Sequence, residues 1–207
     1  MPSLVINGAI AVLSPVAWLA LLVGASDADR LVTHGWRSLK YFTVLSNLLS
    51  ALASALYLAC RLSFGLAPAW LLVLKLAATS AVSLTSLTVA VLLGPRFGWD
   101  KMYAGANLWM HLLLPLLAIV DCVLFVPLGT LPPVATLAAI VPCALYGTWY
   151  LKRVIDYGAN DAGRAIDFYD FLRWGEERIA ALFAGMLAVS WAAGLMLWFG
   201  SRASCPA

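Results

Sequence analysis

The sequence predicts an all-α integral membrane protein: one domain, residues 1–207, built as a six-transmembrane-helix bundle with a short interfacial helix in the last loop. Three observations predict this class. Of the 207 residues, 63% are hydrophobic and only 11% are charged, whereas an average soluble domain is roughly a quarter charged. The mean hydropathy is +0.92. Six apolar stretches are each long enough to cross the hydrocarbon core, which takes about 20 helical residues.

Short loops separate the spans, except for one long connection between the fifth and the sixth. The expected spans are approximately 4–25, 41–63, 69–93, 105–125, 131–151 and 177–199. Only Met1, Pro2 and Ser3 precede the first span, so it lacks the basic segment of a signal peptide. We therefore expect the first span to be a retained helix.

The long connection before the sixth span has an amphipathic pattern. Its apolar residues fall on one helical face and its charged residues on the opposite face: Ala165, Phe168, Tyr169 and Leu172 against Asp167, Asp170 and Arg173. This pattern is typical of a helix that lies in the membrane interface. We expect the helix to anchor the loop, with a lid over a site at that membrane face as the functional alternative.

Basic residues predict which side of the membrane each loop occupies. With six spans, both termini share one side, and loops one, three and five share the other. Those three loops carry ten basic residues, against two (Arg61 and Arg202) on the side of the termini. The positive-inside rule then places loops one, three and five in the cytoplasm. We expect a multi-pass protein of the cell (inner) membrane with its N- and C-termini outside.

Composition also excludes several classes of partner and cofactor. The net charge is only +3, and the basic residues lie between apolar runs, so nucleic acid is not an expected partner. The cysteines show no C-x-x-C spacing and no histidine cluster accompanies them: Cys60, Cys122, Cys143 and Cys205. We expect neither a disulfide framework nor a metal site, and no cofactor. Membrane lipids are the expected partners.

Polar residues inside the spans recur at helical spacing. Polar side chains at membrane depth usually face the interior of a bundle, so their spacing indicates the buried face. Three spans each carry such a stripe of polar residues along one helix face: Thr43, Ser46, Asn47, Ser50 and Ser54 in the second span, Lys75, Thr79, Ser83 and Ser86 in the third, and Asn107 and His111 in the fourth. The alternative is ordinary packing, in which small hydroxyl residues let helices approach closely.

His111 is the one histidine within an expected span, and imidazole titrates near neutral pH. Pro115, four residues later, lacks the amide hydrogen that would bond the His111 carbonyl, so the helix is expected to be weakened there. Thr43 and His111 lie within about 5 Å of the same depth. A threonine hydroxyl beside an imidazole is the minimum for nucleophilic acyl transfer. A hydrogen-bonded structural histidine is the alternative.

Two segments resemble a known family. The run Gly35-Trp36-Arg37-Ser38-Leu39-Lys40-Tyr41-Phe42-Thr43, and the run Asn107-Leu108-Trp109-Met110-His111 with Pro115 and Asp121 after it, are similar to segments of the androgen-induced-gene family. That family comprises six-span membrane hydrolases that use a threonine nucleophile and a histidine on fatty-acid esters of hydroxy fatty acids. The resemblance implies that Thr43 is the nucleophile and His111 its base. A bacterial-type relative could act on other lipid esters.

The leading hypothesis is therefore an intramembrane lipid esterase, a threonine hydrolase acting on fatty-acyl esters with Thr43 and His111 as its catalytic pair. Supporting candidates are Asn47 and Asn107, each one turn from a catalytic residue, and Ser46. The alternative is a non-catalytic small transporter or lipid-binding protein, and a structural or assembly factor is a third class.

Lys75 and Asp121 are expected at matching depth, near the membrane face opposite to that of Thr43 and His111. We expect them to form a structural ion pair, because an unpaired charge within the membrane is costly. The alternative is that each side chain extends to its nearer interface.

Overall fold

The computed structural model describes residues 1–23, 35–157, 167, 169 and 171–204. Throughout these residues the regular elements are helices, and six of them are long and apolar enough to cross a membrane. The six-span all-α bundle predicted from the sequence is confirmed. The spans are Pro2–Leu22, Phe42–Phe64, Ala69–Phe97, Gly105–Leu124, Pro133–Ile155 and Glu177–Ser204.

The spans are not all single α-helices. The first two are α1 (Pro2–Leu22) and α2 (Phe42–Phe64), with the 3₁₀ helix η1 (Gly35–Lys40) before α2. The third consists of α3 (Ala69–Thr88), the π-helix η2 (Val89–Leu93) and α4 (Gly94–Phe97), and the fourth of α6 (Gly105–Leu108), the π-helix η3 (Trp109–Leu113) and α7 (Leu114–Leu124). The last two are η5 with α8 (Pro133–Ile140 and Val141–Tyr157) and α10 (Glu176–Ser204). Short helices fill the loops: α5 (Trp99–Met102), η4 (Leu128–Thr130) and η6 (Phe171–Trp174).

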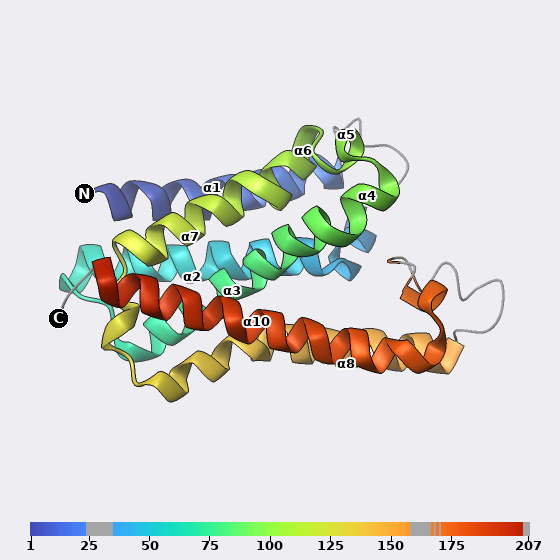
Figure 1. Ribbon diagram of the computed structural model, residues 1–207. Helices are drawn as coiled ribbons and strands as arrows, with labels where there is room; N and C mark the ends of the chain where they lie inside the picture. The colour runs from blue at the N-terminus through green and yellow to red at the C-terminus, as the bar shows by residue number, and fades with distance from the viewer. Residues whose placement is uncertain (24–34, 158–166, 168, 170, 205–207) are drawn as a thin grey trace.

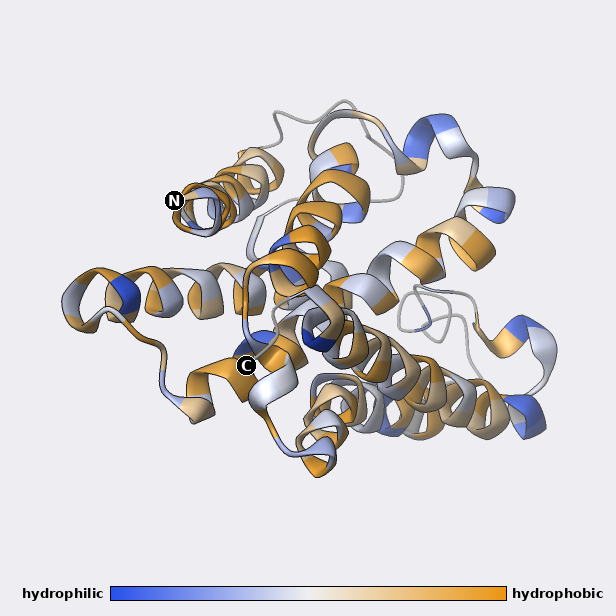
Figure 2. Ribbon diagram, turned by 60° about the vertical axis from the view of Figure 1, so that its left-hand side comes forward, coloured by the Kyte–Doolittle hydropathy of each residue, from blue (hydrophilic) through white to orange (hydrophobic). Residues whose placement is uncertain are grey.

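The long helices lie side by side, and both termini lie at one end of the bundle (Figure 1). The short helices α5 and η6 lie at the opposite end, which we call the loop end. Figure 2 shows apolar residues along most of the helix surfaces and many of the most hydrophilic ones near the helix ends, as a bilayer environment requires.

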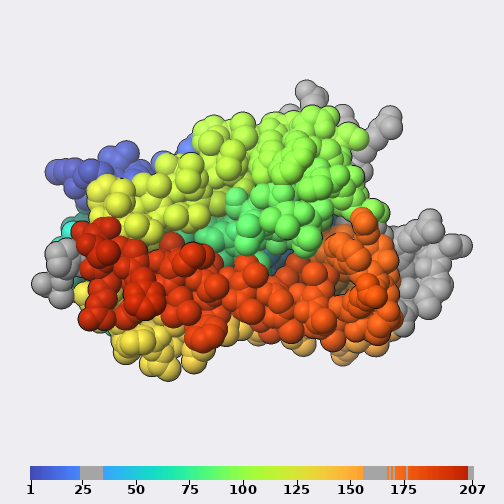
Figure 3. All heavy atoms as spheres, viewed as in Figure 1, coloured from blue at the N-terminus to red at the C-terminus, as the bar shows by residue number. Residues whose placement is uncertain are grey.

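The third span is the central helix of the bundle. Its most apolar window is 61% buried, the largest share among the six spans, and α3 packs against α2, α7, α10 and η5. Small residues permit this close approach: Ala77, Ala78, Ser80 and Ala81 are all buried. In the space-filling view, α3, α7 and α10 form a continuous wall over the half of this face nearest the termini (Figure 3).

The expected span boundaries agree with the structure to within about five residues. The largest differences are at the ends of the third, fifth and sixth spans, which continue to Phe97, Ile155 and Ser204. The third span passes through Gly94 and Pro95 without a break, because Leu93 and Gly94 keep a right-handed helical backbone.

Only part of the expected interfacial helix falls within the described residues. Ala165, Phe168 and Asp170 lie outside them, whereas η6 begins at Phe171. The Asp167 carboxylate accepts the amide hydrogens of Phe171 (2.9 Å) and Leu172 (2.7 Å). This capping by a side chain fixes the start of η6.

Candidate active site

Thr43 lies in the first turn of α2, at the loop end of the bundle. Tyr41, the residue before α2, has an extended backbone, and α2 begins at Phe42. The Thr43 carbonyl accepts hydrogen bonds from the Ser46 hydroxyl (3.1 Å) and the Asn47 amide (2.8 Å). The half-buried Thr43 therefore has a fixed backbone, and the residue lines a pocket.

His111 lies in the π-helix η3, where the sequence predicted a weakened helix. The Leu114 amide donates to the Trp109 carbonyl, five residues back. With the same five-residue spacing, the amide of residue 115 would donate to the Met110 carbonyl, but Pro115 has no amide hydrogen. The Asn47 side chain of α2 donates to that carbonyl instead, at 3.0 Å. π-Turns within membrane helices often mark functional sites, and this one joins the turn of His111 to the turn of Thr43.

The His111 ring has a defined tautomer. Its Nδ1 lies 2.7 Å from the Met102 carbonyl oxygen, and a carbonyl can only accept, so Nδ1 carries the proton of the neutral ring. The other nitrogen, Nε2, is then an acceptor. With the imidazole only 6% exposed, this hydrogen bond fixes both its orientation and its capacity to accept a proton.

Thr43 and His111 line the same pocket, between α1, α2 and the third and fourth spans. The pocket encloses about 580 Å³ including its open mouth, and Asn107 and Tyr169 also line it. Among the described residues, the Thr43 hydroxyl makes no direct hydrogen bond with His111. A looser arrangement without substrate is usual for catalytic pairs, which tighten when the reactant binds.

Thr43 also lines a second pocket, on the other side of the α2 N-terminus. This pocket lies between α2, α3, α8 and α10, encloses about 650 Å³ including its open mouth, and has an almost entirely apolar lining. Thr43, Leu93 and Tyr169 belong to both pockets. The Thr43 side chain therefore lies between an apolar pocket and the pocket that contains the imidazole.

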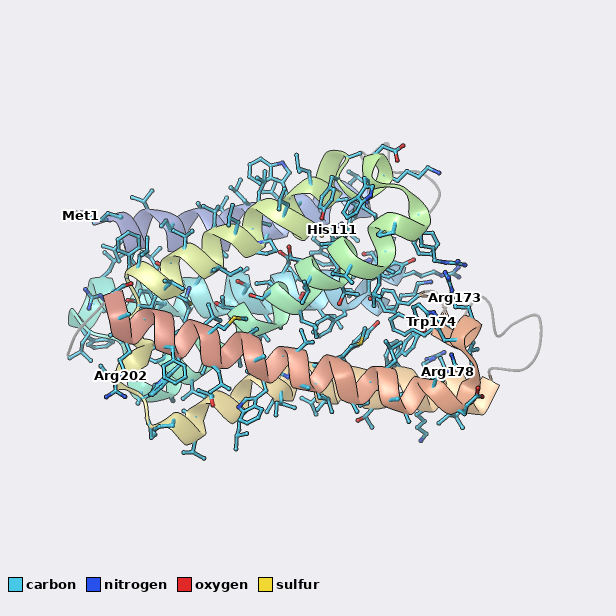
Figure 4. The ribbon with its side chains drawn as sticks, viewed as in Figure 1. Met1, His111, Arg173, Trp174, Arg178 and Arg202 are labelled. Atoms are coloured by element: carbon cyan, nitrogen blue, oxygen red, sulfur yellow. The ribbon has the colours of Figure 1, made fainter. Side chains whose placement is uncertain are left out.

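Figure 4 shows the position of this site along the bundle. His111 lies toward the end that carries Arg173, Trp174 and Arg178, whereas Met1 and Arg202 lie at the other end. The site is therefore in the half of the bundle near loops one, three and five, as the depth comparison from the sequence implied.

Tyrosines complete the wall of the site, and the sequence analysis did not assign them to it. The Tyr169 hydroxyl accepts the Phe42 amide hydrogen (2.9 Å), and the Tyr146 hydroxyl donates to the Lys40 carbonyl (2.6 Å). The Tyr150 hydroxyl bonds the Asp167 carboxylate. Desolvation raises the pKa of Tyr169 to about 12, so its phenol stays protonated at neutral pH. The i, i+4 pair of Tyr146 and Tyr150 in the fifth span was the available signal.

The supporting candidates have different positions. Asn47 uses its amide hydrogens on the carbonyls of Thr43 and Met110, while its Oδ1 has no hydrogen-bond partner among the described residues. Asn107 donates to the Lys101 carbonyl (3.3 Å) and lines the pocket. The Ser46 hydroxyl lies 3.0 Å from that of Thr85. Asn47 and Ser46 therefore hold the backbone at the site, and Asn107 alone of the three lines the pocket.

Lys75 and Asp121 are paired near the other end of the bundle. Lys75 Nζ lies 3.0 Å from Asp121 Oδ2, and both side chains are fully buried. Lys75 also donates to Asn7 (2.7 Å) and Ser54 (3.3 Å). The pair is thus part of a buried network that is separate from the site at the loop end.

Comparison of the chain with protein-family models, with curated proteins and with solved structures finds no match.

Proposed function

We propose that the chain is a membrane-embedded esterase that hydrolyses fatty-acyl esters, with Thr43 as nucleophile and His111 as base. The observation that carries this proposal is that the two side chains, from different helices, line one pocket while His111 keeps Nε2 as an acceptor. An alcohol is too weak a nucleophile without a base, and an imidazole is the usual base. The similarity of both segments to the androgen-induced-gene family points the same way.

The reaction follows from these roles. Nε2 of His111 removes the proton of the Thr43 hydroxyl as Oγ1 attacks the ester carbonyl. The tetrahedral intermediate collapses, the bond to the alcohol oxygen breaks, and His111 returns the proton to that oxygen. A water molecule, deprotonated by His111, then attacks the acyl-threonine and releases the fatty acid with the Thr43 hydroxyl restored.

The apolar pocket beside Thr43 supports a fatty-acyl substrate. Its lining is almost entirely apolar, and burying apolar surface contributes about 25 cal/mol per Å². A fatty-acid ester of a hydroxy fatty acid is the substrate that the family resemblance favours. Within the cell membrane, loops one, three and five in the cytoplasm would place the site at the cytoplasmic leaflet.

A non-catalytic lipid-binding protein is the second candidate, because the apolar pocket would hold an acyl chain whether or not chemistry follows. A transporter is less well supported. The three donors of the Lys75 ammonium all have partners, in Asn7, Ser54 and Asp121. These groups form a closed network within the protein, whereas a transport path needs polar groups that are open to the substrate.

Replacement of the catalytic pair tests the esterase. Thr43→Ala and His111→Ala should each lower the hydrolysis of long-chain lipid esters by about 10²- to 10⁴-fold or more, and the double variant should be no worse than either single one. Thr43→Ser should keep part of the activity, because it retains the hydroxyl but loses the stiff χ1 that aims it.

The assay uses purified protein in detergent, with a panel of long-chain esters. Thr148→Ala is the matched control, because Thr148 is an exposed threonine of α8 that lines neither pocket. Full activity of Thr43→Ala would rule out the esterase, and retained lipid binding in that variant would then favour the lipid-binding protein.

A further inference from the structure

The outer surface of the bundle has a groove between α2 and α8. Its two walls are formed mainly by apolar residues: Leu39, Leu45 and Leu49 before and along α2, and Pro142, Leu145 and Trp149 along α8. Leu145 is 71% exposed, and Leu45 and Trp149 are each 40% exposed. Because both flanking helices are membrane spans, the molecules that contact these exposed side chains are lipids.

The groove exists because α8 packs elsewhere. Its main packing partners are α3 and α10, and Figure 1 shows it running alongside α10. Within the groove the Tyr146 hydroxyl donates to the Lys40 carbonyl, which joins α8 to the segment before α2. The groove is thus open toward the bilayer, with one hydrogen bond across it.

The groove leads to the apolar pocket beside Thr43. Phe42 and Tyr146 line both the groove and that pocket, so they form the partition between them. Their ring centroids lie 5.1 Å apart, and the residue after Phe42 is Thr43 itself. Rotation of these two side chains, with loss of the hydrogen bond from Tyr146 to Lys40, is a smaller change than separation of packed helices.

The groove fits within a single lipid leaflet. Along α2 from Phe42 to Leu49, and along α8 from Pro142 to Trp149, the rise is about 10 Å, which is less than half of a hydrocarbon core about 30 Å thick. An acyl chain of the leaflet next to the loop end can therefore lie along the groove with its ester near the level of Phe42 and Thr43.

We propose that the fatty-acyl chain of the substrate enters sideways from the bilayer, along the groove between α2 and α8, and passes between Phe42 and Tyr146 into the apolar pocket. This route rests on the proposed esterase for the chemistry at Thr43. The binding of the acyl chain does not depend on that chemistry.

A bulky residue in the groove should slow only substrates that need the route. In phosphatidylcholine vesicles, Leu145→Trp should lower the hydrolysis rate of a long-chain ester by about tenfold or more, while a short water-soluble ester is hydrolysed at nearly the normal rate. Ile155→Trp is the control, because Ile155 is an exposed apolar residue of α8 outside the groove. Leu45→Trp, on the opposite wall, replaces Leu145→Trp if the latter fails to fold. Equal effects on both esters, or none on either, would overturn the route.

A second measurement separates the route from the reaction. Cys143 lines the apolar pocket. The variant for this measurement carries Thr43→Ala, and its other three cysteines are replaced by alanine. A long-chain alkyl methanethiosulfonate in the bilayer should modify Cys143 of this variant. Leu145→Trp should slow this modification and Ile155→Trp should not. Slowed modification without any hydrolysis in the parent chain would reject the esterase and retain the route. Unchanged modification would reject the route, whatever the activity.

Discussion

Lys75 and Asp121 are buried charges whose partners come from four helices. Asp121 Oδ1 accepts the Ser3 hydroxyl (2.6 Å), and Oδ2 accepts the Asn7 amide (2.8 Å) in addition to Lys75. The Lys75 ammonium also lies over the Tyr57 ring, 5.6 Å from its centroid. Every hydrogen of the ammonium and both carboxylate oxygens are thus occupied, which is the condition under which a buried ion pair is tolerated.

Asp121→Asn should therefore destabilise the protein, by about 3–5 kcal/mol, because it leaves the Lys75 charge buried without its counter-charge. Lys75→Met combined with Asp121→Leu should recover most of that loss, and incomplete recovery is expected because Asn7 and Ser3 lose their acceptor. Thermal-shift measurements in detergent on Lys75→Met, on Asp121→Leu and on the double variant test the coupling.

Asp100→Asn, at an exposed aspartate of α5, is the control for the loss of a carboxylate. Effects of the two single changes that simply add up in the double variant would contradict the pair. Ester hydrolysis should persist in every variant that folds, because the site lies at the other end of the bundle.

At the scale of residues, depth within a span was enough to pair Lys75 with Asp121, since each charge had one partner at its own level. Ser3 and Asn7 were missed, although their i, i+4 spacing in the first span was a usable signal. In the third span, Lys75 and Thr79 of the expected stripe are buried, whereas Ser83 and Ser86 are half-buried and the buried partner of Ser46 is Thr85. Which hydroxyl meets Ser46 depends on how α2 and α3 pack, and the spacing within one helix does not contain that contact.

At the scale of elements, one buried side chain hydrogen-bonds α2 to η3, beside the apolar packing of Val44 and Met110. Asn47 is fully buried and its amide bridges the Thr43 and Met110 carbonyls. Ser46 also bonds the Thr43 carbonyl, whereas Asn47 is the side-chain donor that the described residues provide for Met110. Asn47 thus joins the turn of Thr43 to the turn of His111, and in the proposed esterase it is a positioning residue.

Asn47→Leu keeps a similar volume but removes this bridge. We expect kcat to fall by about 10²-fold, since a small misplacement of catalytic groups is enough for such a loss, while KM for the ester stays nearly unchanged. Ser50→Ala is the matched control, one turn further along the same buried stripe. Steady-state kinetics distinguish the roles: a normal kcat in Asn47→Leu, or a change confined to KM, would contradict the positioning role.

The sequence indicated the weak point at His111 through Pro115, because a proline removes a specific hydrogen bond wherever it lies in a helix. It did not indicate that η3 would be a π-turn. That register is stabilised by a donor from α2, a contact between residues 63 positions apart, and local periodicity contains no information about it.

At the scale of the whole molecule, the site and the basic loops lie at the same end. Arg37 and Lys40 in η1, Arg96 in α4 and Arg173 in η6 are all at the loop end. The positive-inside rule predicts that this end faces the cytoplasm, and the proposed esterase would then act at the cytoplasmic leaflet.

Labelling of introduced cysteines tests this orientation. In a chain whose four native cysteines are replaced, Arg173→Cys should react with an impermeant maleimide only after the cells are permeabilised. Ser204→Cys, at the end of α10, should react in intact cells. The opposite pattern would move the site to the outer leaflet.

The spans could be predicted because membrane thickness fixes their length and apolar composition. The apolar pocket could not, because its wall combines the fifth and sixth spans with Tyr169 from the loop between them. Tyr169 reaches the Phe42 amide across 127 positions. Such a contact depends on how the spans are arranged around one another, and their individual hydropathy does not determine that arrangement.

The network around Lys75 also bears on how the chain is made. Synthesis proceeds from the N-terminus, so α3 carries its ammonium into the membrane before the Asp121 carboxylate of α7 has left the ribosome. During that interval the Asn7 side chain, already present in α1, is an acceptor that can hold the ammonium, as it does at 2.7 Å in the folded protein. The order of synthesis therefore makes the first helix the earliest source of an acceptor for the Lys75 charge.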